Sequence, residues 1–220
     1  MNHESLDPFA LLLPLLILGL APFAAIMVTC YVKLVVVFAL VRNSLGVQQV
    51  PPNIVLNSLA VIFSMYVMAP VALDIAEKLE QQRVFEAGRM KTADLFDAFL
   101  SAREPLREFL IKHGKDRERK FFVKTAGKLW PQSHVSRVNE RDFLIIVPAF
   151  TLSELTAAFQ IGFVIYLCFV GIDLIIANIL LAMGMSMVSP TVIAVPFKLL
   201  LFTSLDGWSA LIHGLVLSYQ

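Results

Sequence analysis

FLIIVPAFTLSELTAAFQIGFVIYLCFVGIDLIIANILLAMGMSMVSPTVIAVPFKLLLFT, residues 143–203, decides the class of fold. This block of about sixty residues is almost continuously apolar and carries only three charges, Glu154, Asp173 and Lys198. Because a helix needs about 20 apolar residues to cross a hydrocarbon core of roughly 30 Å, the block can hold two spans and part of a third. Charges are costly in such surroundings, so these three positions are candidates for function.

The composition of the whole chain favours the same class. Of the 220 residues, 58% are hydrophobic, and the mean hydropathy is +0.76. The net charge of +1 gives no reason to expect nucleic acid, and the run Lys115–Lys120 mixes both signs, as a solvated helix face does. Cys30 and Cys168 lie in apolar segments without metal-ligand spacing, and the four histidines stand apart, so we expect no disulfide, metal or cofactor.

Prolines and glycines divide the apolar sequence into kinked helical segments. The first segment, 8–41, is too long for one straight span, and Pro14 and Pro22 are expected to kink or break it. The next, 54–73, has Pro70 as a kink or terminator. The C-terminal segments are expected at 143–170, 172–189 and 196–217, with a non-helical interruption between Met183 and Pro196 that protein should cover or that should line a passage.

A polar helical domain separates these apolar parts. Residues 74–142 contain 15 of the 18 Lys and Arg and 12 of the 17 Asp and Glu. Within it, apolar residues such as Phe109 and Leu110 recur at helical spacing, and Pro105 is expected to start a second helix. The predicted organisation is therefore an apolar hairpin (1–73), a polar domain (74–142) and C-terminal apolar helices (143–220). The acidic start and the cations Lys33 and Arg42 at the far end of the first segment place the polar domain outside the cell.

Polar side chains in the apolar parts are the candidate site residues. No nucleophile and base pair, phosphate loop or zinc motif is found in the sequence, so an enzyme is not expected. Helix-to-helix hydrogen bonding and subunit packing are the simplest role for the polar positions. Glu154 and Lys198 have opposite charges, and we expect them to pair, between neighbouring copies of the chain. Further assembly candidates are Lys33, Arg42, Asp173 and Asp206.

Three methionines alternate around Gly184 at Met183, Met185 and Met187. Their unbranched thioether chains are flexible, so a ring of them could close around a passing chain. By spacing alone, however, ordinary filling of a core gap is the better explanation.

Several stretches together resemble the FliP/SctR family, export-gate membrane proteins of flagella and of injectisome type III secretion systems. They include RNSLGVQQVPPN at 42–53, SEL at 153–155, AFQIGF at 158–163, MGM at 183–185, PFKLLLF at 196–202 and DGW at 206–208. The lack of a recognisable signal peptide fits the injectisome branch. The resemblance covers nearly all of the apolar sequence and little of the polar domain.

This resemblance implies an all-α membrane-type protein that assembles into a ring or cone. About five copies would join smaller SctS-type and SctT-type proteins and an SctU-type switch protein. The complex would sit in the bacterial inner membrane, project toward the periplasm and pass unfolded export substrates. Met183, Met185, Ser186 and Met187 fall on the family's methionine constriction, and Glu154 and Lys198 fall on charges that bridge protomers. Ser186 stands where a methionine is usual, and Cys168 where a proline is usual.

Two other functions remain open at this point. A secondary transporter of ions or small solutes would use Glu154, Asp173 and Lys198 as coupling residues, although the two halves of the chain show no internal repeat. A membrane anchor that recruits partners would not need the methionines.

Overall fold

A computed structural model describes residues 16, 19–20, 22–23, 25–47, 49–81, 92–135 and 138–220. Every regular element in this part of the chain is a helix, which confirms the predicted all-α class. The helices are α2 (Tyr31–Ser44), α3 (Asn53–Gln81), α4 (Thr92–His113), α5 (Asp116–Leu129), α6 (Gln132–Val135), α7 (Phe143–Ala182), α8 (Pro190–Ser204) and α9 (Gly207–Leu217).

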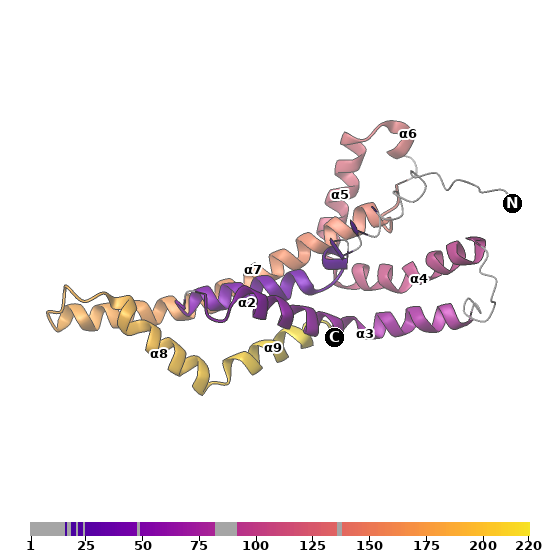
Figure 1. Ribbon diagram of the computed structural model, residues 1–220. Helices are drawn as coiled ribbons and strands as arrows, with labels where there is room; N and C mark the ends of the chain where they lie inside the picture. The colour runs from indigo at the N-terminus through magenta and orange to yellow at the C-terminus, as the bar shows by residue number, and fades with distance from the viewer. Residues whose placement is uncertain are drawn as a thin grey trace.

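The helices form an elongated body built along α7 (Figure 1). Helices α2 and α3 form a hairpin beside the first half of α7, and α8 and α9 fold back from its far end toward α3. Helix α4 extends beside the second half of α3, while α5 leaves α7 crosswise (Figure 1). The expected pairing of 8–41 with 54–73 is thus seen for the described residues from Tyr31 onward.

The core lies where α2 packs between α3 and α7. One face of α2 is completely buried through Leu34, Val37, Phe38 and Val41, which recur at helical spacing. Gly162 of α7 allows a close crossing, because a Cβ atom added there would lie 2.3 Å from Leu40 Cδ1. The close contact of α2 with α7 therefore fixes how the polar side chains on these two helices lie relative to one another.

Three expected helix boundaries are wrong. Helix α3 continues through Pro70 to Gln81, so this proline is not a terminator, while a kink there stays a prediction. Helix α4 runs through Pro105, and α7 runs through Gly171 and is 40 residues long. An internal proline costs about 3 kcal/mol because it removes one backbone hydrogen bond, but the neighbouring turns keep theirs. A long helix packed on other helices tolerates that loss, and a lone glycine costs even less. The predictions for Pro14 and for the side chains of 81–102 fall outside the described residues.

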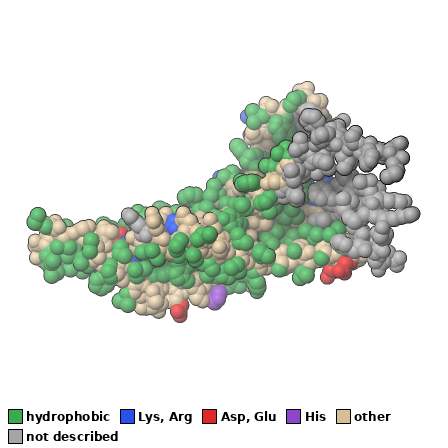
Figure 2. All heavy atoms as spheres, viewed as in Figure 1, with side chains coloured by type: hydrophobic (Ala, Val, Ile, Leu, Met, Phe, Trp, Pro, Cys, Tyr) green, Lys and Arg blue, Asp and Glu red, His purple; other side chains and the backbone are tan. Residues whose placement is uncertain are grey.

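In the part of the chain that the structure describes, two helices, α3 and α7, are long and apolar enough to span a membrane, and α8 with α9 would make a third span bent by 60°. Large apolar side chains are exposed along these helices, and they dominate the surface of the elongated body (Figure 2). Such a surface requires lipid or protein to cover it. The predicted division at residues 73 and 142 stays a prediction, and α3 runs across the first boundary.

Candidate functional site

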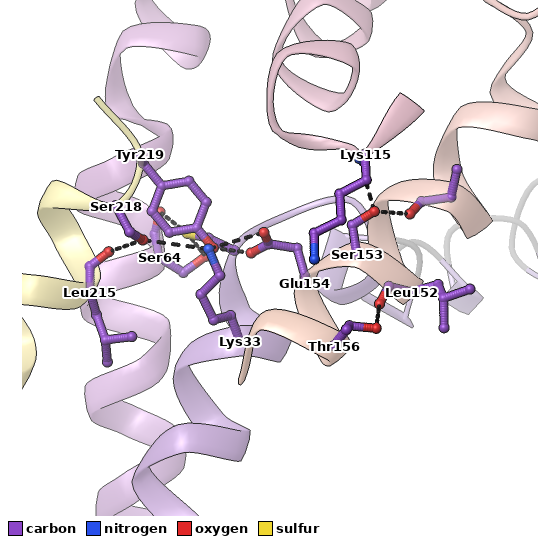
Figure 3. Close-up of polar contacts among 12 residues, drawn as sticks. Lys33, Ser64, Lys115, Leu152, Ser153, Glu154, Thr156, Leu215, Ser218 and Tyr219 are labelled. Atoms are coloured by element: carbon purple, nitrogen blue, oxygen red, sulfur yellow. Dashed lines mark hydrogen bonds and ion pairs between the residues drawn. The ribbon is translucent and has the colours of Figure 1, made fainter. Parts of the chain in front are cut away.

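A buried polar cluster joins α2, α7 and the residues after α9 (Figure 3). Lys33 Nζ lies 3.1 Å from Glu154 Oε1, and both side chains are almost fully buried. The Tyr219 hydroxyl donates a hydrogen bond to Glu154, while Lys33 also donates to Ser218 Oγ at 3.4 Å and lies 4.0 Å from the centre of the Tyr219 ring. Each buried charge thus has a charged partner and a second polar or aromatic contact.

Cys30 adds a neighbouring link to α3. Cys30 lies one helical turn before Lys33, and its thiol donates a hydrogen bond to Ser64 Oγ of α3 at 3.4 Å. The predicted apolar character of Cys30 is confirmed by its complete burial, whereas Cys168 is exposed on α7. Polar contacts at this level of the body therefore connect four segments of the chain.

His113 completes the surroundings of Tyr219 at the end of α4. Its ring centroid lies 5.1 Å from that of Tyr219 and 4.7 Å from that of Phe109. Burial lowers the pKa of His113 to about 4, and the positive charges of Lys112 and Lys33 act in the same direction. The imidazole is therefore neutral at physiological pH.

A second ion pair fastens α8 to the distal half of α7. Lys198 Nζ lies 2.6 Å from Asp173 Oδ2 and donates another hydrogen bond to the backbone oxygen of Ser44 at 3.2 Å. Lys198 is buried, whereas the Asp173 side chain is 41% exposed. The same lysine thus ties three helices together.

Glu154 and Lys198 do not meet in the single chain, because each has another partner. The sequence named Lys33 and Asp173 as assembly candidates but not as these partners, and it missed Tyr219 altogether. A tyrosine close to the end of an apolar helix was the available signal. The expected pairing of Glu154 with Lys198 between copies stays a prediction.

The remaining two assembly candidates lie at turns. Arg42 Nη1 donates to Asn53 Oδ1 at 2.6 Å and to the Pro51 oxygen at 3.2 Å, so it braces the turn between α2 and α3. Asp206 adopts a left-handed backbone, with φ of 48°, where the chain bends between α8 and α9. Arg42 therefore has a structural role within the chain.

The methionines occupy the turn after α7. Gly184 has φ of +74°, its N–H donates to the Leu181 oxygen at 3.0 Å, and the Met185 N–H donates to the Leu180 oxygen at 2.9 Å. This pair of hydrogen bonds is the Schellman ending of a helix, for which a glycine in the left-handed region is preferred. The predicted interruption thus exists, but it is limited to the turn before Pro190, and α8 continues through Pro196.

The turn lies at the far tip of the body (Figure 1). Met187 is 99% exposed, and Met183, Met185 and Ser186 are exposed as well. Core filling within the chain is therefore not their role. Behind them, a groove of about 780 Å³ between α7 and α8 is lined by apolar residues that include Ile176, Met183 and Phe197.

Within the described ranges, no group of three His, Cys, Asp or Glu side chains is placed to hold a metal ion. What the geometry of the described residues defines is an all-helical membrane-type protein with a buried ion pair between Lys33 and Glu154, a partly exposed pair between Lys198 and Asp173, and an exposed methionine tip.

Comparison with known proteins gives the family. The FliP family model matches residues 14–215. "Hypersensitivity response secretion protein HrcR" of Ralstonia nicotianae is 52% identical over 205 residues, which cover 92% of this chain and 93% of that protein. "Yop proteins translocation protein R" of Yersinia pestis is 49% identical over 213 residues, 97% of each chain. "Pathogenicity-related ORF2" of Xanthomonas campestris pv. glycines is 52% identical over 210 residues, 96% of each chain. The chain belongs to the FliP family, in its injectisome, SctR-type branch.

Proposed function

We propose that the chain is a pore-forming core subunit of a type III secretion export gate. It gives unfolded substrate proteins a passage across the inner membrane, and its methionine turn seals the empty passage. The chain is a structural subunit and not an enzyme. The exposed tip at Met183–Met187 carries this proposal, because flexible apolar side chains that no described part of the chain covers are suited to a soft constriction.

The uncovered apolar surface supports assembly around that passage. Exposed side chains on α7 and α8 include Phe159, Phe163 and Phe197, and Phe197 also lines the groove of about 780 Å³. Large apolar surfaces of this kind mark contacts with protein or lipid. We propose about five copies in a closed ring, together with SctS-, SctT- and SctU-type proteins. The complex sits in the bacterial inner membrane and projects toward the periplasm.

The names of the relatives support a function in protein transport. The Ralstonia relative is named as a secretion protein, and the Yersinia relative as a protein of Yop translocation. Glu154 and Lys198 are proposed to bridge neighbouring copies once the ring forms, in addition to their partners within the chain.

Replacing the exposed methionines tests the seal. Cells that carry the whole apparatus with Met185→Ala and Met187→Ala should take up a small membrane-impermeant dye faster than wild-type cells, while the complex keeps its size. Met65→Ala is the matched control, since Met65 is 70% exposed on α3 away from the tip. Unchanged dye uptake in the double variant would refute the gasket. Ion flux through the purified chain alone in liposomes would instead favour a secondary transporter.

A further inference from the structure

The outer face of α5 carries three lysines at helical spacing. Lys120, Lys124 and Lys128 follow one another at intervals of four residues, so they share one face of the helix, and all three are exposed. Phe121 lies beside Lys120 and Lys124 and is 55% exposed. We call these four residues the basic stripe.

The acidic residues of α5 are paired with its arginines. Asp116 pairs with Arg119, and Glu118 pairs with Arg117. Within the helix, these pairs leave the charges of the three lysines uncompensated. Like charges spaced by four residues destabilise a helix, so an acidic surface placed against this face would stabilise it.

The C-terminal part of α3 carries the opposite charges. Asp74, Glu77 and Glu80 follow one another at intervals of three residues, and all three are exposed. Leu73 lies next to Asp74 and Glu77 on the helix and is 65% exposed. We call these four residues the acidic stripe.

The two stripes match in length and in composition. At 1.5 Å per residue, the acidic stripe extends about 9 Å from Asp74 to Glu80, and the basic stripe about 12 Å from Lys120 to Lys128. Each stripe has three charges of one sign and one large apolar side chain. Two such helices laid side by side can pair their charges and cover the apolar side chains between them.

The two stripes lie on different sides of the chain. Helix α3 packs on α4, α4 packs on α7, and α5 projects from the opposite side of α7 (Figure 1). In Figure 2, acidic side chains gather on the edge of α3 that faces away from α5. The Lys115 N–H donates to Ser153 Oγ of α7 at 2.9 Å, which fixes the base of α5. The stripes of one chain therefore do not meet, but each can face a neighbouring copy.

We propose that the basic stripe of one copy binds the acidic stripe of the next copy. This inference rests on the proposed ring and adds a pair of surfaces that joins its members. Because the two surfaces differ, the contact is head-to-tail and repeats from copy to copy, as a closed ring requires. The acidic stripe thus supplies each copy with the partner that α5 lacks.

Reversal of the charges tests the contact in the chain co-expressed with its export partners. Lys120→Glu with Lys124→Glu should lower the ring population about tenfold in native mass spectrometry at low salt, because repulsion replaces attraction. Asp74→Lys with Glu77→Lys should have the same effect. All four changes together should restore the ring population to within about twofold of wild type.

A matched control reverses two other exposed cations. Arg103→Glu with Lys112→Glu on α4 should leave the ring population close to that of wild type. An equal loss of rings in this control would overturn the proposal, since the effect would then follow net charge and not the stripe.

Disulfide cross-linking identifies the copies that are joined. Cys168→Ser first removes the exposed native thiol, while Cys30 is buried. Chains with Glu77→Cys, produced together with chains that carry Lys124→Cys, should form a cross-linked dimer. Met65→Cys in place of Glu77→Cys should not, because Met65 lies twelve residues, about 18 Å, earlier on α3.

The outcomes separate this contact from the proposed function. Rings of wild-type abundance in both reversed pairs, no recovery when the pairs are combined, or no cross-link between copies would overturn the contact and leave the ring in place. Absence of rings in the wild-type complex would overturn both. None of these results bears on the methionine seal, which dye uptake tests separately.

Discussion

Lys33 and Glu154 form an ion pair in which both charged side chains are buried. Both side chains are at most 7% exposed, so each depends on the other for compensation of its charge. Removing one partner of a buried pair costs about 3 to 5 kcal/mol, whereas replacing both by apolar residues of similar size is often neutral.

Lys33→Met should therefore lower the thermal unfolding midpoint in detergent, and Lys33→Met combined with Glu154→Met should recover most of the loss. Circular dichroism on heating measures both. A double variant no more stable than the single one would show that the pair is not the source of the effect.

His113 makes the same region sensitive to acid. Its pKa is about 4 in the folded chain, against an ordinary value of 6.5. The unfolded chain therefore binds a proton between these values that the folded chain does not, and stability falls as pH decreases from about 6.5 toward 4.

The unfolding midpoint of wild-type protein should accordingly decrease over that range more steeply than that of His113→Gln. Comparison of the two slopes removes the contribution of carboxylates, which titrate in both proteins. Parallel slopes would contradict a role for His113.

At the scale of elements, two glycines of α7 differ in how closely another helix packs against them. A Cβ atom at Gly162 would lie 2.3 Å from Leu40 Cδ1 and 3.0 Å from Leu40 Cβ, whereas one at Gly171 meets nothing within 4 Å. Both glycines lie inside α7, so their helix propensities are comparable.

Gly162→Ala should lower the unfolding midpoint because α2 and α7 must separate, by an amount in the range of about 1 to 3 kcal/mol typical of overpacking. Gly171→Ala is the matched control and should be neutral or slightly stabilising, since alanine favours helix. If both variants behaved alike, the close crossing of α2 and α7 would not limit stability.

At the scale of the whole molecule, the exposed apolar surface predicts self-association. Side chains such as Leu174, Ile179 and Leu200 are each at least 53% exposed, and none of the described residues covers them. Native mass spectrometry of the chain co-expressed with its export partners should give a ring of about five copies. Glu154→Ala or Lys198→Ala should reduce the ring population if these charges bridge copies. Rings of wild-type abundance in both variants would argue against the bridge.

The sequence alone determined the helical membrane class and the position of the methionine turn. Long apolar runs and a glycine followed by proline are local signals, so they could be read without a structure. The sequence-based prediction misplaced helix boundaries at Pro70, Pro105 and Gly171. Packing along a long helix compensates for the local loss of a backbone hydrogen bond or of helix propensity.

Only the tertiary structure decided which charges are partners. Glu154 could pair with any cation that the helices bring near it, and the contact of α2 with α7 brings Lys33. Tyr219 comes to the same place from the turn after α9, and His113 comes from the end of α4. In α5, Asp116 pairs with Arg119 and Glu118 pairs with Arg117. These contacts depend on helix rotation and on the level at which helices cross, and neither quantity is encoded in a short stretch of sequence.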